Sequence, residues 1–131
     1  MENPGVNEPQ HSTNACTAAL SAVEDTLYVI GGKWKLKIII AIKEHGRMRF
    51  NELQRTVEGI SARVLSNELK DLELNGFIKR NVYTKSPVVI EYQLTGYSDT
   101  LDGLLKSLVE WGTMHREKIR QDSRQAATQN N

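Results

Sequence analysis

Residues 50–76, FNELQRTVEGISARVLSNELKDLELNG, decide the fold of this 131-residue chain. The pattern predicts a short helix over residues 50–57, a turn at Gly59 and a longer helix over residues 62–75. Ser61 precedes the longer helix, and its hydroxyl can accept a hydrogen bond from a backbone N–H at the helix start. Two helices joined by a tight turn in this order are typical of a helix-turn-helix.

The longer helix has an apolar side and, at about 100° per residue, a polar side opposite to it. The apolar side consists of Leu65, Leu69 and Leu72. A DNA major groove about 12 Å wide admits one helix, in which Arg can bond to guanine and Asn to adenine. A merely solvated polar side is the alternative, since many surface helices are amphipathic. The residues predicted to contact bases are Ser61, Arg63, Ser66 and Asn67.

Two strand-like runs follow, over residues 77–83 and 88–94, and residues 84–87 form the tip of a hairpin between them. A hairpin in this place is a wing, whose basic residues can neutralise DNA phosphates and release counterions. Protection of an exposed strand against aggregation is the alternative role for its lysines. The residues predicted to contact phosphates, in the wing and elsewhere, are Lys33, Arg49, Lys70, Lys79, Arg80 and Lys85.

Further elements are predicted on both sides of this unit. Residues 18–30 and 33–45 predict two helices separated by a glycine pair, residues 47–49 a brief strand, and residues 95–120 a long helix that Thr95 can cap. The last helix carries more apolar residues on one side than so small a domain needs. A second copy of the chain could cover them, with burial inside the same subunit as the alternative.

Charge and composition fit one domain that binds nucleic acid. Residues 33–85 carry a net charge of +6 and the rest of the chain −5, although the total is only +1. A basic segment between acidic ones suits a nucleic-acid footprint, and a solvated basic face is the alternative. Residues 1–15 predict a flexible lead-in, residues 16–120 the folded domain, and residues 121–131 a disordered tail.

Other functional classes find little support. The longest apolar run, over residues 38–42, is far shorter than the ~20 residues of a membrane span, and no secretory signal opens the sequence. A single cysteine, Cys16, excludes an intramolecular disulfide and a multi-cysteine zinc site. Three distant histidines, and serines without a nearby base, give no catalytic set. We therefore expect a cytoplasmic protein that is not an enzyme and has no cofactor, no metal and no membrane partner.

Several ordered motifs between residues 21 and 117 occur together. They include Ile30-Gly31-Gly32-Lys33-Trp34, Arg49-Phe50-Asn51-Glu52-Leu53, Gly59-Ile60-Ser61, Arg63-Val64-Leu65-Ser66, Gly76-Phe77-Ile78 and Trp111-Gly112. At this spacing the chain resembles the HxlR-type winged helix-turn-helix regulators of bacteria, relatives of the MarR group. The resemblance implies a homodimer, joined mainly by the first and last helices, on a palindromic operator. The expected interface residues are Leu20, Val23, Leu27, Leu101, Leu104, Leu105, Leu108 and Trp111.

One feature departs from that family. Many members carry a cysteine three residues before the glutamate of the first helix, and in some of them it senses oxidants or electrophiles. Counting back from Glu24, that position here is Ser21, and Cys16 lies five residues earlier. A redox switch therefore cannot be transferred by position. Cys16 stays a candidate for an intersubunit disulfide, with an inert thiol as the alternative.

The predicted fold is mainly α with a small β-hairpin wing, an α+β winged helix-turn-helix with N- and C-terminal dimerisation helices. The predicted function is a sequence-specific transcriptional regulator that binds double-stranded DNA as a homodimer on a palindromic operator. The alternative is a winged helix that contacts another protein and has no operator. A polar, basic outer side of the recognition helix favours DNA, and Leu74 is the one apolar exception on it.

Overall fold

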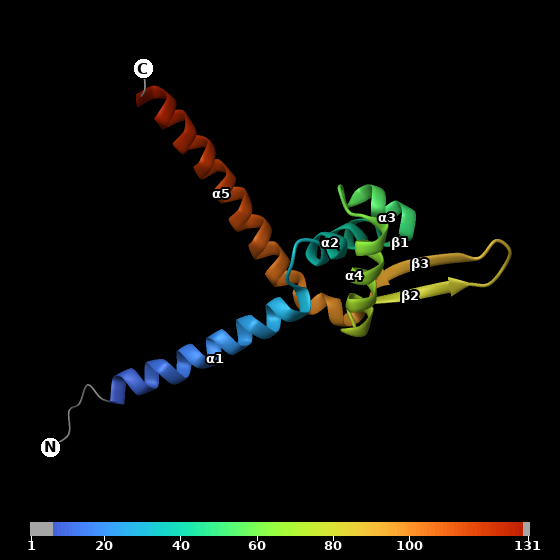
Figure 1. The fold of residues 1–131 in the computed structure, drawn as a ribbon, viewed down its shortest axis with the longest axis horizontal. Coiled ribbons are helices and arrows are strands. Elements are labelled where there is room, and N and C mark those ends of the chain that lie inside the picture. Colours follow the sequence, from blue (N-terminus) through green and yellow to red (C-terminus); the bar gives the residue numbers. More distant parts are fainter. Residues whose placement is uncertain (1–6, 130–131) are drawn as a thin grey trace. The chain divides into compact units, whose positions relative to one another are not determined.

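The structure, a computed structural model, describes residues 7–129, with side chains from residue 14 onward. These residues form two compact units that divide after Thr95 (Figure 1). The first unit contains α1 (Asn7–Ile30), α2 (Lys35–His45), β1 (Arg47–Arg49), α3 (Phe50–Thr56), α4 (Ala62–Leu74), β2 (Ile78–Tyr83) and β3 (Val89–Leu94). The second contains the 3-10 helix η2 (Gly96–Leu101) and α5 (Asp102–Gln129). The predicted winged helix-turn-helix fold is confirmed.

The core of the first unit is built around α2 and α4, which contact each other. The fully buried side chains of α2 are Ile38, Ile39 and Ile42. On α4, Leu65 and Leu72 are fully buried and Leu69 is 2% exposed. Because burying one such side chain contributes roughly 1.5–3 kcal/mol, the leucine stripe decides which side of α4 turns inward. The polar side of α4 is thereby left outward, as the sequence predicted.

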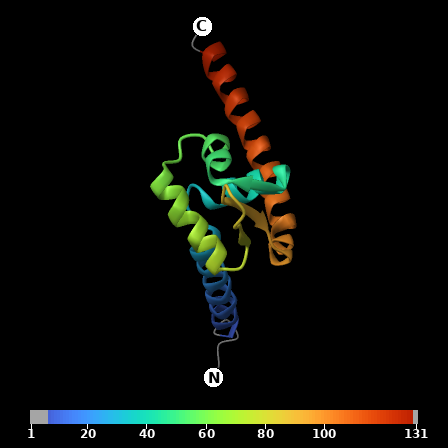
Figure 2. The same cartoon turned by 90° about the vertical axis from the view of Figure 1, so that its right-hand side faces the viewer.

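The sheet has three antiparallel strands in the order β1-β3-β2. The hairpin strands pair from Ile78 opposite Leu94 to Tyr83 opposite Val89. In Figure 1 the hairpin extends away from the body of the first unit. Figure 2, turned by 90°, shows α4 along one side of that body with the hairpin pointing toward the viewer. The hairpin is therefore the predicted wing, and it projects beside α4.

Two glycines separate α1 from α2. The N–H of Gly31 donates to the carbonyl oxygen of Leu27 at 2.8 Å, and a Cβ on Gly31 would overlap that oxygen. Gly32 follows with a φ of +91°, in the left-handed region that glycine adopts without a steric penalty. The pair therefore ends α1 as predicted, and α2 begins at Lys35 rather than at Lys33.

The two longest helices extend beyond their predicted ends, to Asn7 in α1 and to Gln129 in α5. Residues 7–15 and 121–129 are thus helical, where the sequence predicted a flexible lead-in and a disordered tail, and the remaining terminal residues lie outside the described part. The predicted ends of the two helices were placed where the periodic apolar residues end. In residues 121–129, Gln, Arg and Ala favour helix through their own propensity, without an apolar side. Pro9 lies in the first turn of α1, where proline is tolerated.

The second unit begins with η2 rather than with an α-helix that starts at Thr95. The hydroxyl of Thr95 donates to the carbonyl oxygen of Gly76, and its N–H donates to that of Phe77 at 3.0 Å. These bonds hold the end of β3 within the first unit, and α5 starts only at Asp102. None of the helices over residues 7–129 has the length and hydrophobicity that crossing a membrane requires.

Candidate nucleic-acid interface

A side-chain cap fixes the start of α4. The N–H of Val64 donates to Oγ of Ser61 at 3.2 Å, which confirms the predicted cap. The turn before it contains Gly59 with a φ of +88°, a conformation that favours glycine. The Ser61 oxygen accepts this bond for the helix, and its O–H remains available as a donor.

An ion pair fixes the rotation of α4 about its own axis. The Nζ of Lys35, in the first turn of α2, lies 2.8 Å from Oε2 of Glu68 and 3.5 Å from Oδ2 of Asp71. Burial by itself lowers the pKa of Lys35, but the hydrogen bonds and charges of the two carboxylates outweigh it and raise the pKa above 10.5. Lys35 therefore stays charged and holds both carboxylates toward α2.

The outer side of α4 carries the residues predicted to contact bases. Arg63 and Asn67 are exposed, Lys70 is exposed one turn further on, and Ser66 is half-buried beside them. Leu74, the apolar exception near the end of the helix, is 83% exposed. If Arg63 and Asn67 were packed inside the unit, α4 could not insert them into a DNA groove. Both side chains are instead exposed to solvent.

A hollow of about 260 Å³ lies between α4 and the wing. It brings together Ser66 and Lys70 of α4 with Arg80 of β2, and Glu73 and Tyr92 also line it. Two cations beside a hydroxyl suit the oxygens of a phosphate, since both side-chain types commonly bond to the DNA backbone. The sequence could not predict this proximity, because it depends on how the helix and the strand pack in three dimensions.

The basic side chains of the wing do not all face the same way. Lys79, Arg80 and Lys85 are exposed. Because successive side chains of a strand point to opposite faces, Lys79 points away from the face on which Arg80 lines the hollow. Arg80 therefore fits a phosphate contact beside α4, and Lys79 would need another part of the backbone. Arg49, a further predicted phosphate contact, is exposed where β1 meets α3.

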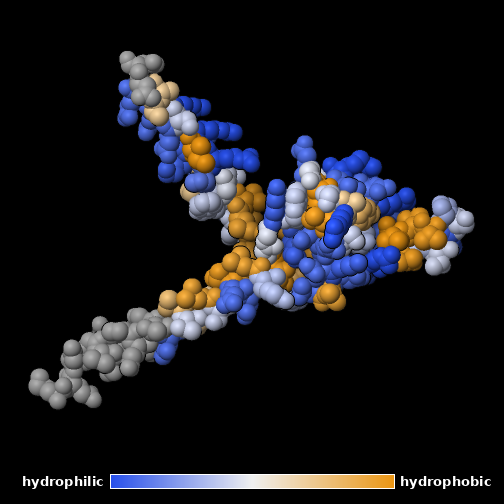
Figure 3. All heavy atoms as spheres, viewed as in Figure 1, coloured by the Kyte–Doolittle hydropathy of each residue, from blue (hydrophilic) through white to orange (hydrophobic). Residues whose placement is uncertain are grey.

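The wing also carries exposed apolar side chains that were not predicted from the sequence. Val82, Tyr83 and Val88, near its tip, are 45%, 41% and 63% exposed, and Figure 3 shows hydrophobic residues gathered on the hairpin. The guanidinium of Arg47 in β1 donates to the Tyr83 hydroxyl at 3.1 Å. No other element covers both faces of a two-stranded hairpin that extends from the body. Apolar residues near the predicted hairpin tip could therefore have been expected to be exposed.

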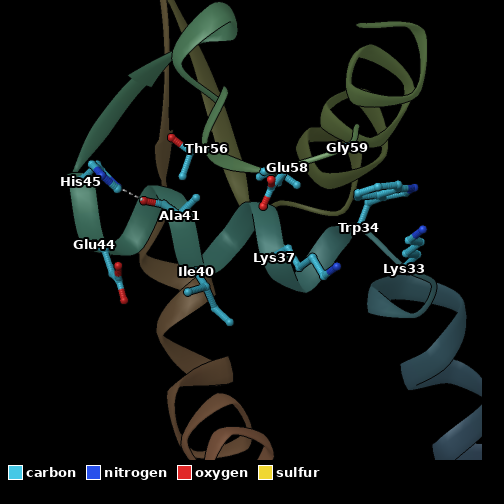
Figure 4. Close-up of a pocket in the computed structure, with 11 residues that line it drawn as sticks. Lys33, Trp34, Lys37, Ile40, Ala41, Glu44, His45, Thr56, Glu58 and Gly59 are labelled. Atoms are coloured by element: carbon cyan, nitrogen blue, oxygen red, sulfur yellow. Dashed lines mark hydrogen bonds between the residues drawn. The ribbon is translucent and has the colours of Figure 1, made fainter. Parts of the chain in front are cut away.

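Two lysines lie over the ring of Trp34, the residue that precedes α2. Lys33 comes before the helix, and Lys37 is in its first turn. The Nζ of Lys33 lies 4.7 Å, and that of Lys37 5.3 Å, from the ring centroid. All three residues line a hollow of about 670 Å³ beside the α3–α4 turn, with Glu58 and Gly59 across from them (Figure 4). Lys33 was predicted from the sequence and Lys37 was not, although the four-residue spacing of the two lysines indicates a shared face.

The residues expected at a dimer interface fall into two groups. Leu101 and Leu105 are 8% and 5% exposed, so they are covered within a single chain, which was the alternative for this stripe. Their place in the expected interface stays a prediction, because the periodicity of a helix does not say which of its apolar residues its own chain covers. The exposed members, at 39–64%, are Leu20, Val23, Leu27, Leu104, Leu108 and Trp111.

Cys16 lies on α1 with an exposed side chain. Exposure makes the thiol accessible to oxidants, but a redox role stays a prediction. Among the described residues, no group of three or more His, Cys, Asp or Glu side chains is placed to hold a metal ion.

Comparison with known proteins gives several relatives. YtcD of Bacillus subtilis, named an HTH-type transcriptional regulator, is 40% identical over 102 residues, which cover 78% of this chain and 80% of YtcD. A crystal structure of ytcD matches with a TM-score of 0.70 at 42% identity, covering 72% of this chain and 96% of that one. A structure titled as the reduced redox regulator HypR matches with a TM-score of 0.70 at 38% identity, covering 76% of this chain and 98% of that one. The structure of a MarR-family regulator from Enterococcus faecalis V583 matches with a TM-score of 0.66 at 34% identity, covering 77% of this chain and 92% of that one.

The winged fold, the outward polar side of α4 and these relatives define the class of protein. It is a DNA-binding transcriptional regulator of the helix-turn-helix type, and not an enzyme. Residues 29–120 match the family described as HxlR-like helix-turn-helix. The chain belongs to this HxlR-like family, as its sequence motifs predicted.

Proposed function

We propose that the chain reads a palindromic operator in double-stranded DNA as a homodimer. The observation that carries this proposal is the outward side of α4, where Arg63 and Asn67 are exposed while the leucine stripe is buried. Arg suits the O6 and N7 acceptors of guanine, and Asn suits N6 and N7 of adenine. Recognition helices contact base edges mainly with their N-terminal residues, so Arg63, in the first turn, is the best placed.

Other side chains complete the proposed contact surface. Ser61 and Ser66 would contact base edges beside Arg63, and the cations around α4 would contact the two DNA backbones. Phosphate contacts fix the position of a protein on the duplex but carry no sequence information. The support for this division is the placement of Lys70 and Arg80 in one hollow next to α4. The proposed phosphate contacts are Lys33, Arg49, Lys70, Lys79, Arg80 and Lys85.

A second copy of the chain accounts for the exposed apolar side chains of α1 and of α5. Single exposed leucines are ordinary, but rows of them along a helix are typical of interaction surfaces. On α5, Leu104, Leu108 and Trp111 recur at helical spacing and are 39%, 46% and 61% exposed. A two-fold axis would repeat both rows and could place the two α4 helices one DNA turn, about 34–36 Å, apart. The other proposed interface residues are Leu20, Val23 and Leu27.

A protein-binding winged helix without an operator is the second candidate function, and the exposed Leu74 and wing tip favour it. Selection of binding sites from a random DNA library by the purified full chain separates the two functions. Our proposal expects a dyad-symmetric motif whose half-sites are one helical turn apart. A folded, dimeric protein that enriches no motif would leave the protein-binding function. Because a regulator acts on the chromosome, a cytoplasmic location is part of the same proposal.

A further inference from the structure

We propose that Lys33, Trp34 and Lys37 form a clamp for the DNA backbone at the N-terminal end of α4, here named the Trp34 clamp. The proposal rests on the proposed function, because it assumes that α4 lies in the major groove. It gives a role to Lys37 and to the indole ring. Its ligand is a phosphate diester of the DNA strand next to the start of the recognition helix.

The ring of Trp34 is fixed relative to the turn that precedes α4. It is half-buried, and a Cβ built on Gly59 would lie 3.8 Å from its Cη2 atom. Two residues after Gly59, Ser61 caps α4. Figure 4 shows the side chains of Lys33 and Lys37 on the side of the ring away from Gly59. The two ammonium groups are thus carried by a platform that packs against the start of the recognition helix.

Among the described residues, no carboxylate neutralises the charges of these two lysines. In the part of the chain that the structure describes, neither ammonium group lies within ion-pair distance of a carboxylate, although Glu44 and Glu58 line the same hollow. Lys35, which lies between them in sequence, pairs with Glu68 and has a side chain that is only 12% exposed. Lys35, which packs against α4, therefore has carboxylate partners, whereas Lys33 and Lys37 contact the face of the Trp34 ring and no carboxylate of the described residues.

A cation held over an aromatic ring keeps its charge and loses part of its rotational freedom before any ligand arrives. Lysine side chains normally lose that freedom when they bind, so prior ordering lowers the entropic cost of binding an anion. Two ordered ammonium groups near one ring suit phosphates of a single strand, which repeat every ~3.4 Å along the helix axis. The arrangement therefore favours the DNA backbone over an isolated carboxylate.

The location of the clamp complements that of the wing. A helix in a groove about 12 Å wide has a sugar-phosphate backbone on either side of it. The hollow that contains Lys70 and Arg80 lies between α4 and the wing, whereas the clamp borders the turn that leads into α4. The two sites are therefore placed for the two backbones that border one major groove.

The test measures binding of the full chain to its selected operator and to unrelated DNA of equal length over a range of salt concentrations. For Lys33→Met together with Lys37→Met, we expect both affinities to fall by the same factor. The slope of log K against log salt should decrease by about 2, since each phosphate contact contributes about 0.9. Trp34→Phe keeps an aromatic ring in place and should give a smaller decrease. The matched control is Lys43→Met with Lys106→Met, which removes the same charge outside the hollow and should leave the slope near that of the wild type.

A second arm locates the contact. A DNA-cleaving reagent attached at Lys37→Cys, in a Cys16→Ser background, should cut the backbone at the edge of each half-site, and the same reagent at Lys43→Cys should not. An unchanged salt slope in the double variant, with operator binding intact, would overturn the clamp and leave the proposed function standing. If the wild-type chain binds no DNA, both fail. Saturable calorimetric binding of inorganic phosphate that depends on Lys33 and Lys37 would assign the site to a free phosphate ligand instead and overturn the clamp.

Discussion

The ammonium group of Lys35 lies 2.8 Å from a carboxylate oxygen of Glu68, and this contact joins the first turn of α2 to the middle of the recognition helix. The two side chains are 12% and 21% exposed, so water screens the pair only in part. Leucines on a helix define its inner side, but hydrophobic contact is not directional. A hydrogen-bonded ion pair is directional, and it therefore sets the angle at which Arg63 and Asn67 face outward.

The ion pair should contribute measurably to stability. In a double-mutant cycle with Lys35→Met and Glu68→Gln, we expect a coupling free energy of about 1–2 kcal/mol, above the 0.2–1 kcal/mol that is typical of exposed pairs. Urea unfolding of the four proteins measures it. The control cycle uses Lys118 and Asp122, whose exposed side chains also form an ion pair at 2.6 Å. Equal coupling in the two cycles would contradict the role given to Lys35.

The same contact predicts a dependence of stability on pH. Burial lowers the pKa of Lys35, and Glu68 with Asp71 raises it by more, so the folded-state pKa exceeds the ordinary 10.5. Since a raised lysine pKa favours the folded state while the unfolded chain is also protonated, its contribution is complete below pH 10.5 and is lost as pH rises through the folded-state pKa. The difference in unfolding free energy between wild type and Lys35→Met should therefore be constant from pH 8 to about 10 and shrink above it. If the difference in unfolding free energy grew above pH 10, the folded-state pKa of Lys35 would be lowered and not raised, which would contradict this account.

The Ser61 cap should stabilise α4. Replacing it in Ser61→Ala removes the acceptor for the Val64 N–H and should lower the free energy of unfolding by about 0.5–2 kcal/mol. Ser61→Asp keeps an acceptor at the cap and should restore most of the loss. Thermal and urea unfolding measure both variants. A Ser61→Asp protein as unstable as Ser61→Ala would mean that the cap is not what matters at this position.

The dimer proposal predicts that charge on the exposed rows separates the subunits. Leu27→Glu on α1 or Leu108→Glu on α5 would place a carboxylate in an apolar interface, so either variant should sediment as a monomer at concentrations where the wild type is a dimer. Leu74→Glu is the matched control, because Leu74 is 83% exposed and lies outside both rows. A wild-type chain that sediments as a monomer at all concentrations would refute the dimer.

Local patterns were enough to predict the helix-turn-helix. The spacing of Leu65, Leu69 and Leu72, the cap at Ser61 and the turn at Gly59 are properties of neighbouring residues, and each has the predicted role in the structure. The predicted helices were shorter than α1 and α5 because an apolar side marks only part of each helix. Residues 121–129 have none, and they are helical all the same.

The candidate site was predicted only in its parts. The sequence assigned Ser66, Lys70 and Arg80 to DNA separately, but the hollow that unites them arises from packing of α4 against β2. For Lys37, the four-residue spacing from Lys33 indicates a shared face, but that both ammonium groups lie over the Trp34 ring follows only from the three-dimensional structure. Periodicity also could not separate Leu105, which is buried in one chain, from Leu108, which is exposed.

The most direct test of the central claim compares Arg63→Ala with Lys70→Ala on the selected operator, on operators changed at single base pairs, and on unrelated DNA. If α4 reads bases through Arg63, the Arg63→Ala protein should lose about 1–3 kcal/mol of discrimination, a factor of roughly 5–150, at one base pair in each half-site. Lys70→Ala should weaken binding to all DNA equally. Arg63→Ala that weakens every DNA by the same factor, or weakens none, would contradict the claim that this helix reads the operator.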